Sequence, residues 1–416
     1  MAGEFGYNLS VSDVYVFDSF KEGYMFNDIS RVFVDWISYV YVWESMWTVV
    51  NATKFVFEDM GAVIFDKRRD NQVFMKLGLD EMRYKWYDFA VVSYGGYRME
   101  GVKRLSSSER IMYGIDMLGL WLSQPQVRSF GEASASDVAE KVARDVLERY
   151  KNHAGFDYRV EVERSTDRGR YVQGNISSTQ FLYYLASVAR DGSGEKGYVC
   201  WFDRIRDEEE NVDVVRYKMQ SLKTLREKEV TKYMEFVFDY GDVERAFSND
   251  GFSRKDTLPV LSFHIDSRNT GMLMNKKQFE IYEFDIKRLA VKKKEKDIVD
   301  KEEKDIVKSF FETVGKEYRM RAVDYADTGG WFGRYVANLL GLRYKRRLWV
   351  MVVGCSKLEL GEKVRILLPT GYDNELIEAL SGDWIVGSMV HMYSMPDKHW
   401  LMKVGLYQID WNKRIE

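Results

Sequence analysis

The stretch that decides the fold lies near the C-terminus. There, GCSKLELGEKVRILLP (Gly354–Pro369) is followed by SGDWIVGSMVHMYSMPDKHWLMKVGLYQID (Ser381–Asp410). Gly361 permits a tight turn in the first segment, and apolar side chains alternate along the strand that follows it, Val364–Leu368. In the second segment, two apolar runs flank the turn sequence SMPDKH (394–399). We predict that both segments form β-hairpins.

Length and composition indicate a globular protein of several domains. The chain has 416 residues, of which 45% are hydrophobic and 15% aromatic. This length suggests about two to four domains, and the richness in aromatic and β-branched residues favours strands. Only four prolines are present, which argues against proline-rich linkers.

Charge, cysteine usage and hydropathy exclude several classes of protein. Basic and acidic residues number 62 and 65, for a net charge of −3, so no basic excess indicates a nucleic-acid-binding protein. Cys200 and Cys355 lie far apart in the sequence, and we expect two buried, reduced thiols. We find no signal peptide and no membrane-length apolar run, and therefore expect a soluble protein without an export signal.

Residues 1–122 are predicted to form a first small β-barrel or sandwich. In SRVFVDWISYVYVWE (30–44), Val40 and Val42 fall on one face, with Tyr39 and Tyr41 on the other. Further short strands follow, separated by acidic or glycine-containing turns. We interpret the aromatic stripes of this region as core side chains rather than as a ligand site.

Residues 123–220 are predicted to form an α+β insert domain. An amphipathic helix is expected within 129–155, with Ser136 as its N-cap and Gly155 at its end. A second helix follows, capped by Ser177 or Ser178. We also predict strands in FDYRVEVE, GYVCWFDR and VDVVRYKM.

The remaining chain is predicted to form a second barrel interrupted by a charged, helical excursion. Residues 221–284 and 346–416 would supply the barrel, and 285–345 the excursion. The excursion repeats EKDIV at 295–299 and 303–307. Because its charges alternate in sign, we predict a solvated segment that is peripheral to the β domains.

The sequence contains no strong catalytic or metal-binding constellation. Nucleotide-binding, zinc-protease and nucleophile-elbow motifs are absent. His391 and His399 flank a predicted turn, but two histidines without a third ligand make a weak zinc site. We therefore predict no catalytic residue, no cofactor and no metal, and a protein that is not an enzyme.

The C-terminal segments resemble the barrel of phage tail hub proteins. That family includes the baseplate hub of T-even-like contractile phages, the late control protein D group and the hub part of type VI secretion spikes. Its pattern is a Gly-x3-Leu-x2-Gly-x2-Val turn and strand, then a Gly-aromatic-x-Val strand that runs to a His. The matching positions are Gly354, Leu358, Gly361, Val364, Gly382, Trp384, Val386, Val390 and His391.

The resemblance extends over most of the chain in order. The run QGNISSTQFLYYLA (Gln173–Ala186) is similar to the helical insert of the family. At the N-terminus, the strand ending in WESMW (Trp43–Trp47) is similar in outline. The charged segment 285–325 has no counterpart in the family.

The resemblance implies a mainly β, α+β fold with two small hub barrels, and a structural role in the virion. The expected assembly is a homotrimer that joins the sixfold tail tube to the threefold central spike and surrounds the channel through which DNA leaves. Expected partners are the tube protein, the spike protein and baseplate wedge or tape-measure proteins, with DNA passing without specific binding. The protein would be assembled in the host cytoplasm and reside in the tail baseplate.

Symmetry gives this expectation a physical reason. If residues 1–122 and the β parts of 219–416 form two similar barrels, three chains supply six sites that face the tube. Because a strongly basic channel would hold DNA by releasing counterions, we expect a polar or acidic channel lining.

Two alternatives remain open at the level of sequence. One is the hub of a phage-derived contractile injection system, such as a tailocin, which would work by the same mechanics. The other is an unrelated enzyme or carbohydrate-binding β protein. A carbohydrate binder should expose aromatic side chains on one face of a sheet.

Overall fold

The computed structural model describes twelve segments of the chain and shows how strands distant in sequence come together. Neither the charged excursion predicted over 285–345 nor the helix predicted within it lies among the described residues. The described segments are 5–6, 9–18, 37–46, 51–59, 71–81, 83–99, 108–192, 197–207, 210–236, 257–266, 347–367 and 382–408.

The N-terminal strands form a first β unit, an antiparallel sheet in the order β3-β4-β7-β6-β5-β2. Its inner face buries apolar side chains such as Val40, Phe55 and Val73. The strands are β2 (Val11–Asp18), β3 (Ile37–Ser45), β4 (Ala52–Asp59), β5 (Asn71–Gly78), β6 (Tyr84–Met99) and β7 (Ser108–Asp116).

The C-terminal strands form a second β unit, which closes into a six-stranded barrel. Going around the barrel the order is β14-β15-β18-β17-β16-β13, and β13 pairs with β14 again. The hairpin predicted in Ser381–Asp410 is confirmed by the pairing of β17 with β18, whereas the hairpin predicted in Gly354–Pro369 is wrong, because in the described residues β15 and β16 pair with other strands. A short strand, β1 (Phe5–Gly6), adds to β15. The barrel strands are β13 (Lys232–Phe236), β14 (Thr257–Asp266), β15 (Arg347–Cys355), β16 (Lys363–Leu367), β17 (Asp383–Ser394) and β18 (His399–Tyr407).

The two β units repeat one strand order. The antiparallel path β3-β4-β7-β6-β5 of the first unit corresponds to β14-β15-β18-β17-β16 of the second. The units differ at the sixth strand, because β2 is antiparallel to β5 whereas β13 is parallel to β16. The described residues include no pairing between β2 and β3. The mainly β fold with a closed barrel is thus confirmed, and the first unit is a six-stranded sheet of matching order.

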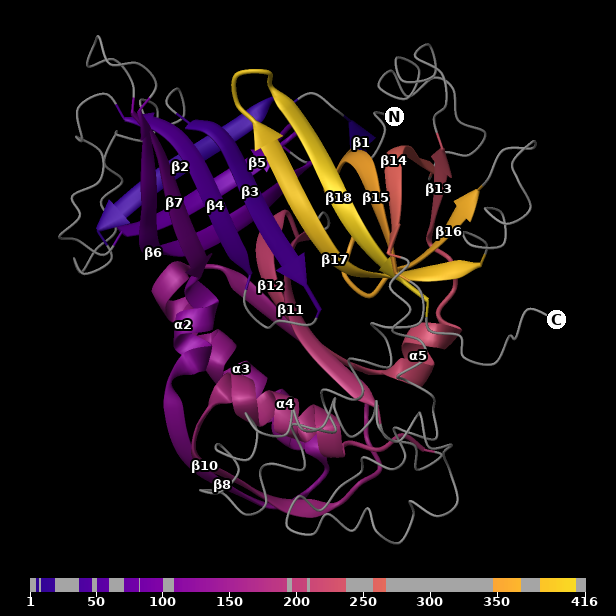
Figure 1. The fold of residues 1–416 in the computed structure, drawn as a ribbon. Helices are drawn as coiled ribbons and strands as arrows, with labels where there is room; N and C mark the ends of the chain where they lie inside the picture. Colours follow the sequence, from indigo (N-terminus) through magenta and orange to yellow (C-terminus); the bar gives the residue numbers. More distant parts are fainter. Residues whose placement is uncertain are drawn as a thin grey trace, which may run out of the picture.

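A single strand pair joins the two units into one sheet. β3 runs antiparallel to β17, with Tyr41 opposite Met392 in the register. Backbone hydrogen bonds extend the pairing at both ends, from Met395 N–H to the Ser38 carbonyl (3.1 Å) and from Met46 N–H to the Gly387 carbonyl (3.0 Å). Figure 1 shows β3 and β17 side by side, where the first unit meets the barrel. We call this pair the joint.

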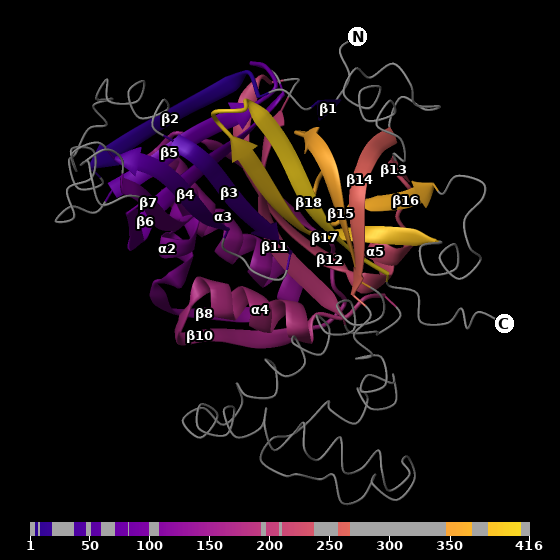
Figure 2. The same ribbon diagram turned by 45° about the horizontal axis from the view of Figure 1, so that its top comes forward.

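The insert lies below both β units and contacts each of them (Figures 1 and 2). α3 and α4 pack on a three-stranded sheet in the order β11-β12-β9, and β8 pairs with β10 as a separate ribbon. The elements are α2 (Met117–Ser123), β8 (Pro125–Ala133), α3 (Ala135–Ala154), β9 (Asp157–Val162), β10 (Gly169–Ser177), α4 (Ser178–Val188), β11 (Tyr198–Asp207), β12 (Val212–Ser221) and α5 (Leu222–Glu227).

Helix ends in the insert follow the capping rules, with one correction to the sequence prediction. Ser134, not Ser136, caps α3: its hydroxyl accepts a hydrogen bond from Asp137 N–H. The predicted end of α3 is confirmed, because Gly155 has the left-handed φ of +77° that glycine adopts without strain. Ser177, one of the two caps predicted for α4, forms a capping box with Gln180.

The ribbon β8–β10 was not predicted: no strand was expected over Pro125–Ala133, which partly overlaps the region 129–155 assigned to a helix, or over Gly169–Ser177. β10 alternates buried and exposed residues, with Tyr171 and Gln173 inward and Val172 outward. The sequence does not show this period as alternating hydrophobicity, because the buried Gln173 is polar and the exposed Val172 is apolar.

The hydrophobic core crosses the boundaries between the units. One cluster of buried side chains fills both β units and includes Val199, Trp201 and Leu225 from the insert. A second cluster fills the insert and includes Tyr84 and Trp86 from β6. Because the core is shared, each unit buries part of its apolar surface only against its neighbours.

Gly354 offers a test of barrel packing. A Cβ at this position would lie 2.2 Å from Cδ2 of Trp400, whose ring is fully buried and has no room to move. We expect Gly354→Ala to lower the free energy of unfolding by about 1–3 kcal/mol, measured by chemical denaturation. Gly131→Ala is the control, since nothing lies within 4 Å of its Cβ position. Equal effects of the two substitutions would contradict this packing.

Candidate functional site

The joint presents an outer face, turned away from the core, that continues over seven strands. One register row runs Ser262, Met351, Lys403, Val390, Trp43, Ala52, Ile115. The neighbouring row runs Leu401, Met392, Tyr41, Lys54, Tyr113. We use the name outer face for these twelve residues together with Tyr39, Ser394 and Trp349.

Aromatic side chains are exposed on this face. Tyr39 and Trp43 are each 39% exposed, and Tyr113 is 42% exposed. The rings of Tyr39, Tyr41 and Trp43 follow one another along β3 at centroid distances of 6.4 and 6.2 Å. The prediction that these aromatic stripes are core side chains is therefore wrong for β3. A register shift between Ile37 and Tyr39 contributes, because it leaves Ile37 buried and Tyr39 exposed.

The charges of the outer face are cationic. Lys54 Nζ lies 5.7 Å from the ring centroid of Tyr41, and Lys403 Nζ lies 5.1 Å from that of Trp349. The outer face contains no carboxylate. Its chemistry is thus that of aromatic rings with ammonium groups above them.

Beneath the joint, on its core side, lies a buried pair of ionisable groups. Glu44 of β3 and His391 of β17 are almost fully buried, with Oε2 and Nε2 3.5 Å apart. This distance is longer than a normal hydrogen bond, so the contact is mainly electrostatic. Burial lowers the pKa of His391, although Glu44 opposes the shift, and the imidazole is neutral at pH 7.

Glu44 is ionised in this environment. Burial alone would raise its pKa, but the charge of the buried Lys85 and the neighbouring His391 outweigh that effect and lower it to about 2. Since His391 is neutral, Lys85 is the effective counter-charge. The core side of the joint therefore holds one ionised carboxylate, that of Glu44, whose charge is balanced by the buried Lys85.

Aromatic side chains surround this pair. The hydroxyls of Tyr87 and Tyr393, one from each β unit, are 3.0 Å apart. The rings of Tyr87, Tyr393 and Trp400 lie 5.9–6.2 Å from the His391 ring, centroid to centroid. These contacts hold the histidine in one orientation and exclude water from it.

The insert is fixed to the first β unit by buried polar contacts. Arg204 of β11 forms a buried ion pair with Asp116, at the end of β7, with Nη2 2.6 Å from Oδ1. Asp88 of β6 accepts hydrogen bonds from Gln72 (2.6 Å) and from Tyr150 of α3 (2.7 Å). Burial raises the pKa of Asp88, and these two donors oppose the shift.

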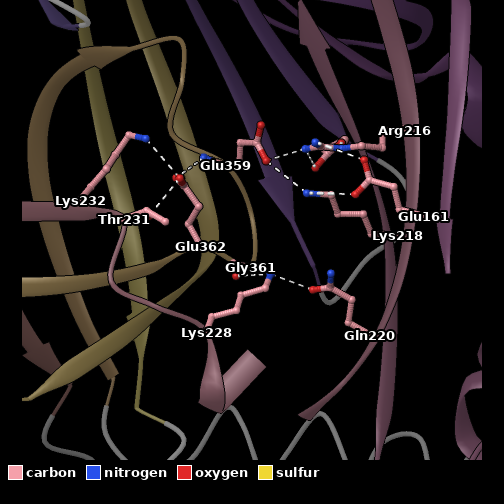
Figure 3. A network of polar contacts seen from close by, with 11 residues as sticks. Glu161, Arg216, Lys218, Gln220, Lys228, Thr231, Lys232, Glu359, Gly361 and Glu362 are labelled. Carbon is pink, nitrogen blue, oxygen red and sulfur yellow. Dashed lines mark hydrogen bonds and ion pairs between the residues drawn. The ribbon is translucent and has the colours of Figure 1, made fainter. Parts of the chain in front are cut away.

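A second polar network fixes the insert to the barrel (Figure 3). Glu359, in the loop between β15 and β16, accepts from Arg216 (2.6 Å) and from Lys218 (3.2 Å) of β12. Arg216 also binds Asp203 through two contacts of 2.9 and 2.8 Å. Burial alone would raise the pKa of Glu359, but Arg216 and Lys218 lower it to about 2.

The same region brings the insert against the glycine turn of the barrel. Lys228 Nζ donates to the Gly361 carbonyl (3.0 Å) and to Oε1 of Gln220 (2.8 Å), as Figure 3 shows. Gly361 has a φ of +77°, and a Cβ there would lie 2.8 Å from the Trp201 ring of β11. Glycine is required here both by the backbone conformation and by the close approach of the insert.

The structure places the predicted signature residues in two groups. Gly361 meets the insert and His391 meets the first β unit, so these two positions lie at contacts between units. The others lie in the barrel and its turns: Leu358, Val364, Trp384 and Val386 are buried, Gly354 packs against Trp400, and Gly382 has a φ of +102°.

The ionisable groups in these contacts do not form a recognisable catalytic site. Among the described residues, no group of three His, Cys, Asp or Glu side chains could hold a metal ion. His391 faces the core, whereas His399 pairs with Ser394 of the outer face, so the two histidines do not meet. Cys200 and Cys355 are buried and form no disulfide, as predicted. No helix in the described part of the chain is long and apolar enough to cross a membrane.

Comparison with known proteins shows the fold. No protein-family model and no curated protein matches the sequence. Among solved structures, the chain is similar to the 43 kDa tail protein of prophage MuSo2 from Shewanella oneidensis. The TM-score is 0.51 at 10% identity, with 95% of this chain and 98% of that one covered. The chain therefore shares the fold of a phage tail protein.

Two further structures give lower scores. A tail protein from Neisseria meningitidis is 11% identical, with 96% of this chain and 97% of that one covered and a TM-score of 0.44. The E. coli c3393 protein, a component of the type VI secretion system, is 9% identical, with 91% and 74% covered and a TM-score of 0.46.

Sequence analysis missed most of the residues that connect the units. Glu44, Lys85, Arg204 and Arg216 were not singled out, because acids and bases are abundant in this chain. Their common feature is a charge that is buried in the fold, which the sequence does not reveal: Arg204 stands among Asp203, Arg206 and Asp207 in YVCWFDRIRD (198–207). Such a charge is retained only where a partner neutralises it.

The joint should respond to pH through His391. Its pKa is below 6.5 in the folded protein, so below pH 6.5 the unfolded state binds a proton there that the folded state does not. The free energy of unfolding should then decrease as the pH is lowered below 6.5, and His391 contributes up to about 1.4 kcal/mol per pH unit to this decrease. We expect His391→Phe to flatten the dependence of unfolding free energy on pH between 7.5 and 5.5, a window in which Glu44 stays mostly ionised in both the folded and the unfolded state.

His399→Phe, at the partly exposed end of the same hairpin, is the control for the loss of a histidine that does not lie beneath the joint. If His391→Phe left the slope unchanged, the assignment of a neutral, buried imidazole at the joint would be wrong.

The network in Figure 3 gives a matched pair of substitutions. Glu359→Gln leaves Lys218 without its nearest carboxylate, which is expected to cost about 2 kcal/mol at neutral pH. Glu161→Gln removes a carboxylate that is 44% exposed and 3.7 Å from the same lysine, with an expected effect below about 0.5 kcal/mol. Thermal denaturation compares them, and a larger loss in Glu161→Gln would contradict this ranking.

Proposed function

We propose that this protein is a structural hub of a phage tail baseplate. In this role it forms a homotrimeric adapter between the sixfold tail tube and the threefold central spike, around the channel for DNA. The observation that carries the proposal is the internal repeat: two β units of one strand order, joined edge to edge in a single chain. The shared fold with a prophage tail protein supports it.

The repeat explains why such a chain suits an adapter. Two β units per chain in three chains present six comparable surfaces to a sixfold tube. The inserts differ from the β units and are present once per chain, so the opposite side of the assembly keeps threefold character. The joint and the two polar networks hold the units of each chain in fixed relative positions.

The remaining expectations follow from this role. The partners are other copies of the chain, the tube and spike proteins, and wedge or tape-measure proteins of the baseplate, and the site of action is the tail of the virion. The protein acts without catalysis, since its ionisable clusters are buried and serve the contacts between units. The hub of a tailocin-like injection system would have the same architecture.

One observation favours a second candidate, a carbohydrate-binding protein. Tyr39, Trp43 and Tyr113 are exposed on one sheet face, as a sugar-stacking surface requires. Against it, the rings of Tyr41 and Trp43 stack on each other at 6.2 Å, which uses ring faces that a sugar would need. A glycan-binding assay with Trp43→Ala as the comparison separates the two functions.

Immunoelectron microscopy tests the proposal. Particles from cells that carry the gene would be labelled with antibodies against this protein. We expect label at one end of a tail or of a contractile tube, and the presence or absence of a DNA-filled head distinguishes phage from injection system. Label on no particle, together with glycan binding lost in Trp43→Ala, would overturn the hub assignment.

A further inference from the structure

Buried ionisable side chains from both β units meet beneath the joint, and one of them can take up a proton near neutral pH. Glu44 of β3 and Lys85 of β6 come from the first unit, whereas His391 and Tyr393 of β17 come from the barrel. None of these four residues is more than 3% exposed. A proton bound by His391 therefore changes the charge of a buried contact between the two units.

The closed joint offers a protonated His391 no hydrogen-bond acceptor within the described chain. An imidazolium donates from both ring nitrogens, but neither Nδ1 nor Nε2 of His391 has a hydrogen-bond partner among the described residues. Oε2 of Glu44 lies 3.5 Å from Nε2, which is beyond a normal hydrogen bond. A buried, charged donor without an acceptor is costly, so the closed joint disfavours the imidazolium.

The charges that face His391 also oppose a second cation at this place. Taken strand by strand, the titratable and charged groups that act on the pair are Glu44 of β3, Lys85 and Tyr87 of β6, Arg204 of β11 and Tyr393 of β17. Burial raises the pKa of both tyrosines well above the usual value, so they stay neutral. Arg204 is already paired with Asp116. Protonation of His391 would thus leave one carboxylate, that of Glu44, to two cations.

Separation of the two β units at the joint would hydrate His391 without opening the barrel. Glu44 and Tyr87 would leave with the first unit, and β3 would remain paired with β4. On the other side, β17 would remain paired with β18 from Ile385 to Ser394. The hydroxyl contact of 3.0 Å between Tyr87 and Tyr393 would also break, and water can replace it on both sides.

We propose that the joint is an acid-sensitive latch, in which binding of a proton by His391 favours separation of β3 from β17 while the barrel stays closed. The latch is a property of the contacts beneath the joint and does not rest on the proposed hub function. It goes beyond the pH dependence of global unfolding, because it assigns the response to one strand pair.

The pH at which the latch acts follows from the two states of His391. Burial lowers its pKa in the closed joint, whereas a hydrated imidazole in the open joint has the ordinary pKa of about 6.5. The closed state is therefore fully favoured above pH 6.5 and becomes less favoured as the pH falls below it. Glu44, with a pKa of about 2 in the closed joint, acts in the same direction, but only near the lower pH at which a hydrated glutamate titrates.

Hydrogen–deuterium exchange of the full chain at pH 7.5 and 5.5 tests the latch. Each exchange rate is divided by the intrinsic rate of that amide at the same pH, so that protection reports the opening equilibrium. We expect the protection of amides in residues 39–45 that donate across the joint to fall by up to about tenfold between the two pH values. The protection of amides between β15 and β18 should change by less than about twofold, because their opening does not hydrate His391.

Two variants separate titration of His391 from a general loosening of the joint. His391→Phe keeps a buried ring that cannot bind a proton, so the difference between the two pH values should disappear. Lys85→Met removes the competing ammonium and leaves Glu44 to a protonated His391, so the difference should shrink to less than about threefold. His399→Phe is the control for the loss of a histidine that does not lie beneath the joint.

Three results would overturn the latch. The first is an equal response of the joint and of the β15–β18 amides, which would mean that only global unfolding depends on pH. The second is stronger protection of the joint at pH 5.5, which would mean that the imidazolium binds Glu44 in the closed state. The third is a response that His399→Phe abolishes as fully as His391→Phe does. If His391→Phe does not fold, Lys85→Met decides, and an undiminished response in that variant counts against the latch.

Discussion

The backbone hydrogen bonds between β3 and β17 are the constraint on which the rest of the structure depends. Each contributes only about 0.5–1.5 kcal/mol net, but together they fix direction, register and distance between two units that are far apart in sequence. The pairing requires that one edge of β3 and one edge of β17 are left unpaired by other strands over the same length. β16 meets this condition by pairing with β17 only at residues 383–385, which leaves 388–394 open to β3.

Charged side chains then determine how the insert packs against the two β units. Arg204 with Asp116, and Arg216 with Asp203 and Glu359, are ion pairs between or beside units, with most of their side chains out of water. Such pairs add little net stability, because desolvation offsets much of the attraction. An arrangement that separated the partners would leave a buried charge unpaired, which is far more costly. The networks therefore select one orientation of the insert, while the shared hydrophobic core supplies most of the stabilisation.

The sequence predicted the elements that depend on local rules, such as alternation and capping. It did not predict the features that depend on contacts between distant parts of the chain. The hairpin of β17 and β18, the strands β9, β11 and β12, and the ends of α3 and α4 follow from alternation and capping, apart from the shift of one cap from Ser136 to Ser134. The strand order, the joint and the role of Glu44 depend on pairings between residues hundreds of positions apart, which no local pattern encodes. The exposure of Tyr39 and Trp43 was mispredicted for the same reason, because composition does not reveal which face of a sheet another unit covers.

Hydrogen–deuterium exchange at the joint tests the central claim, that the two β units form one rigid body through β3 and β17. The account predicts that amides of residues 39–45 and 388–394 which donate across the joint are protected as strongly as amides between β17 and β18 inside the barrel, and that both sets exchange together. Rapid exchange across the joint, with the β17–β18 amides still protected, would show that the units separate freely and would contradict the account.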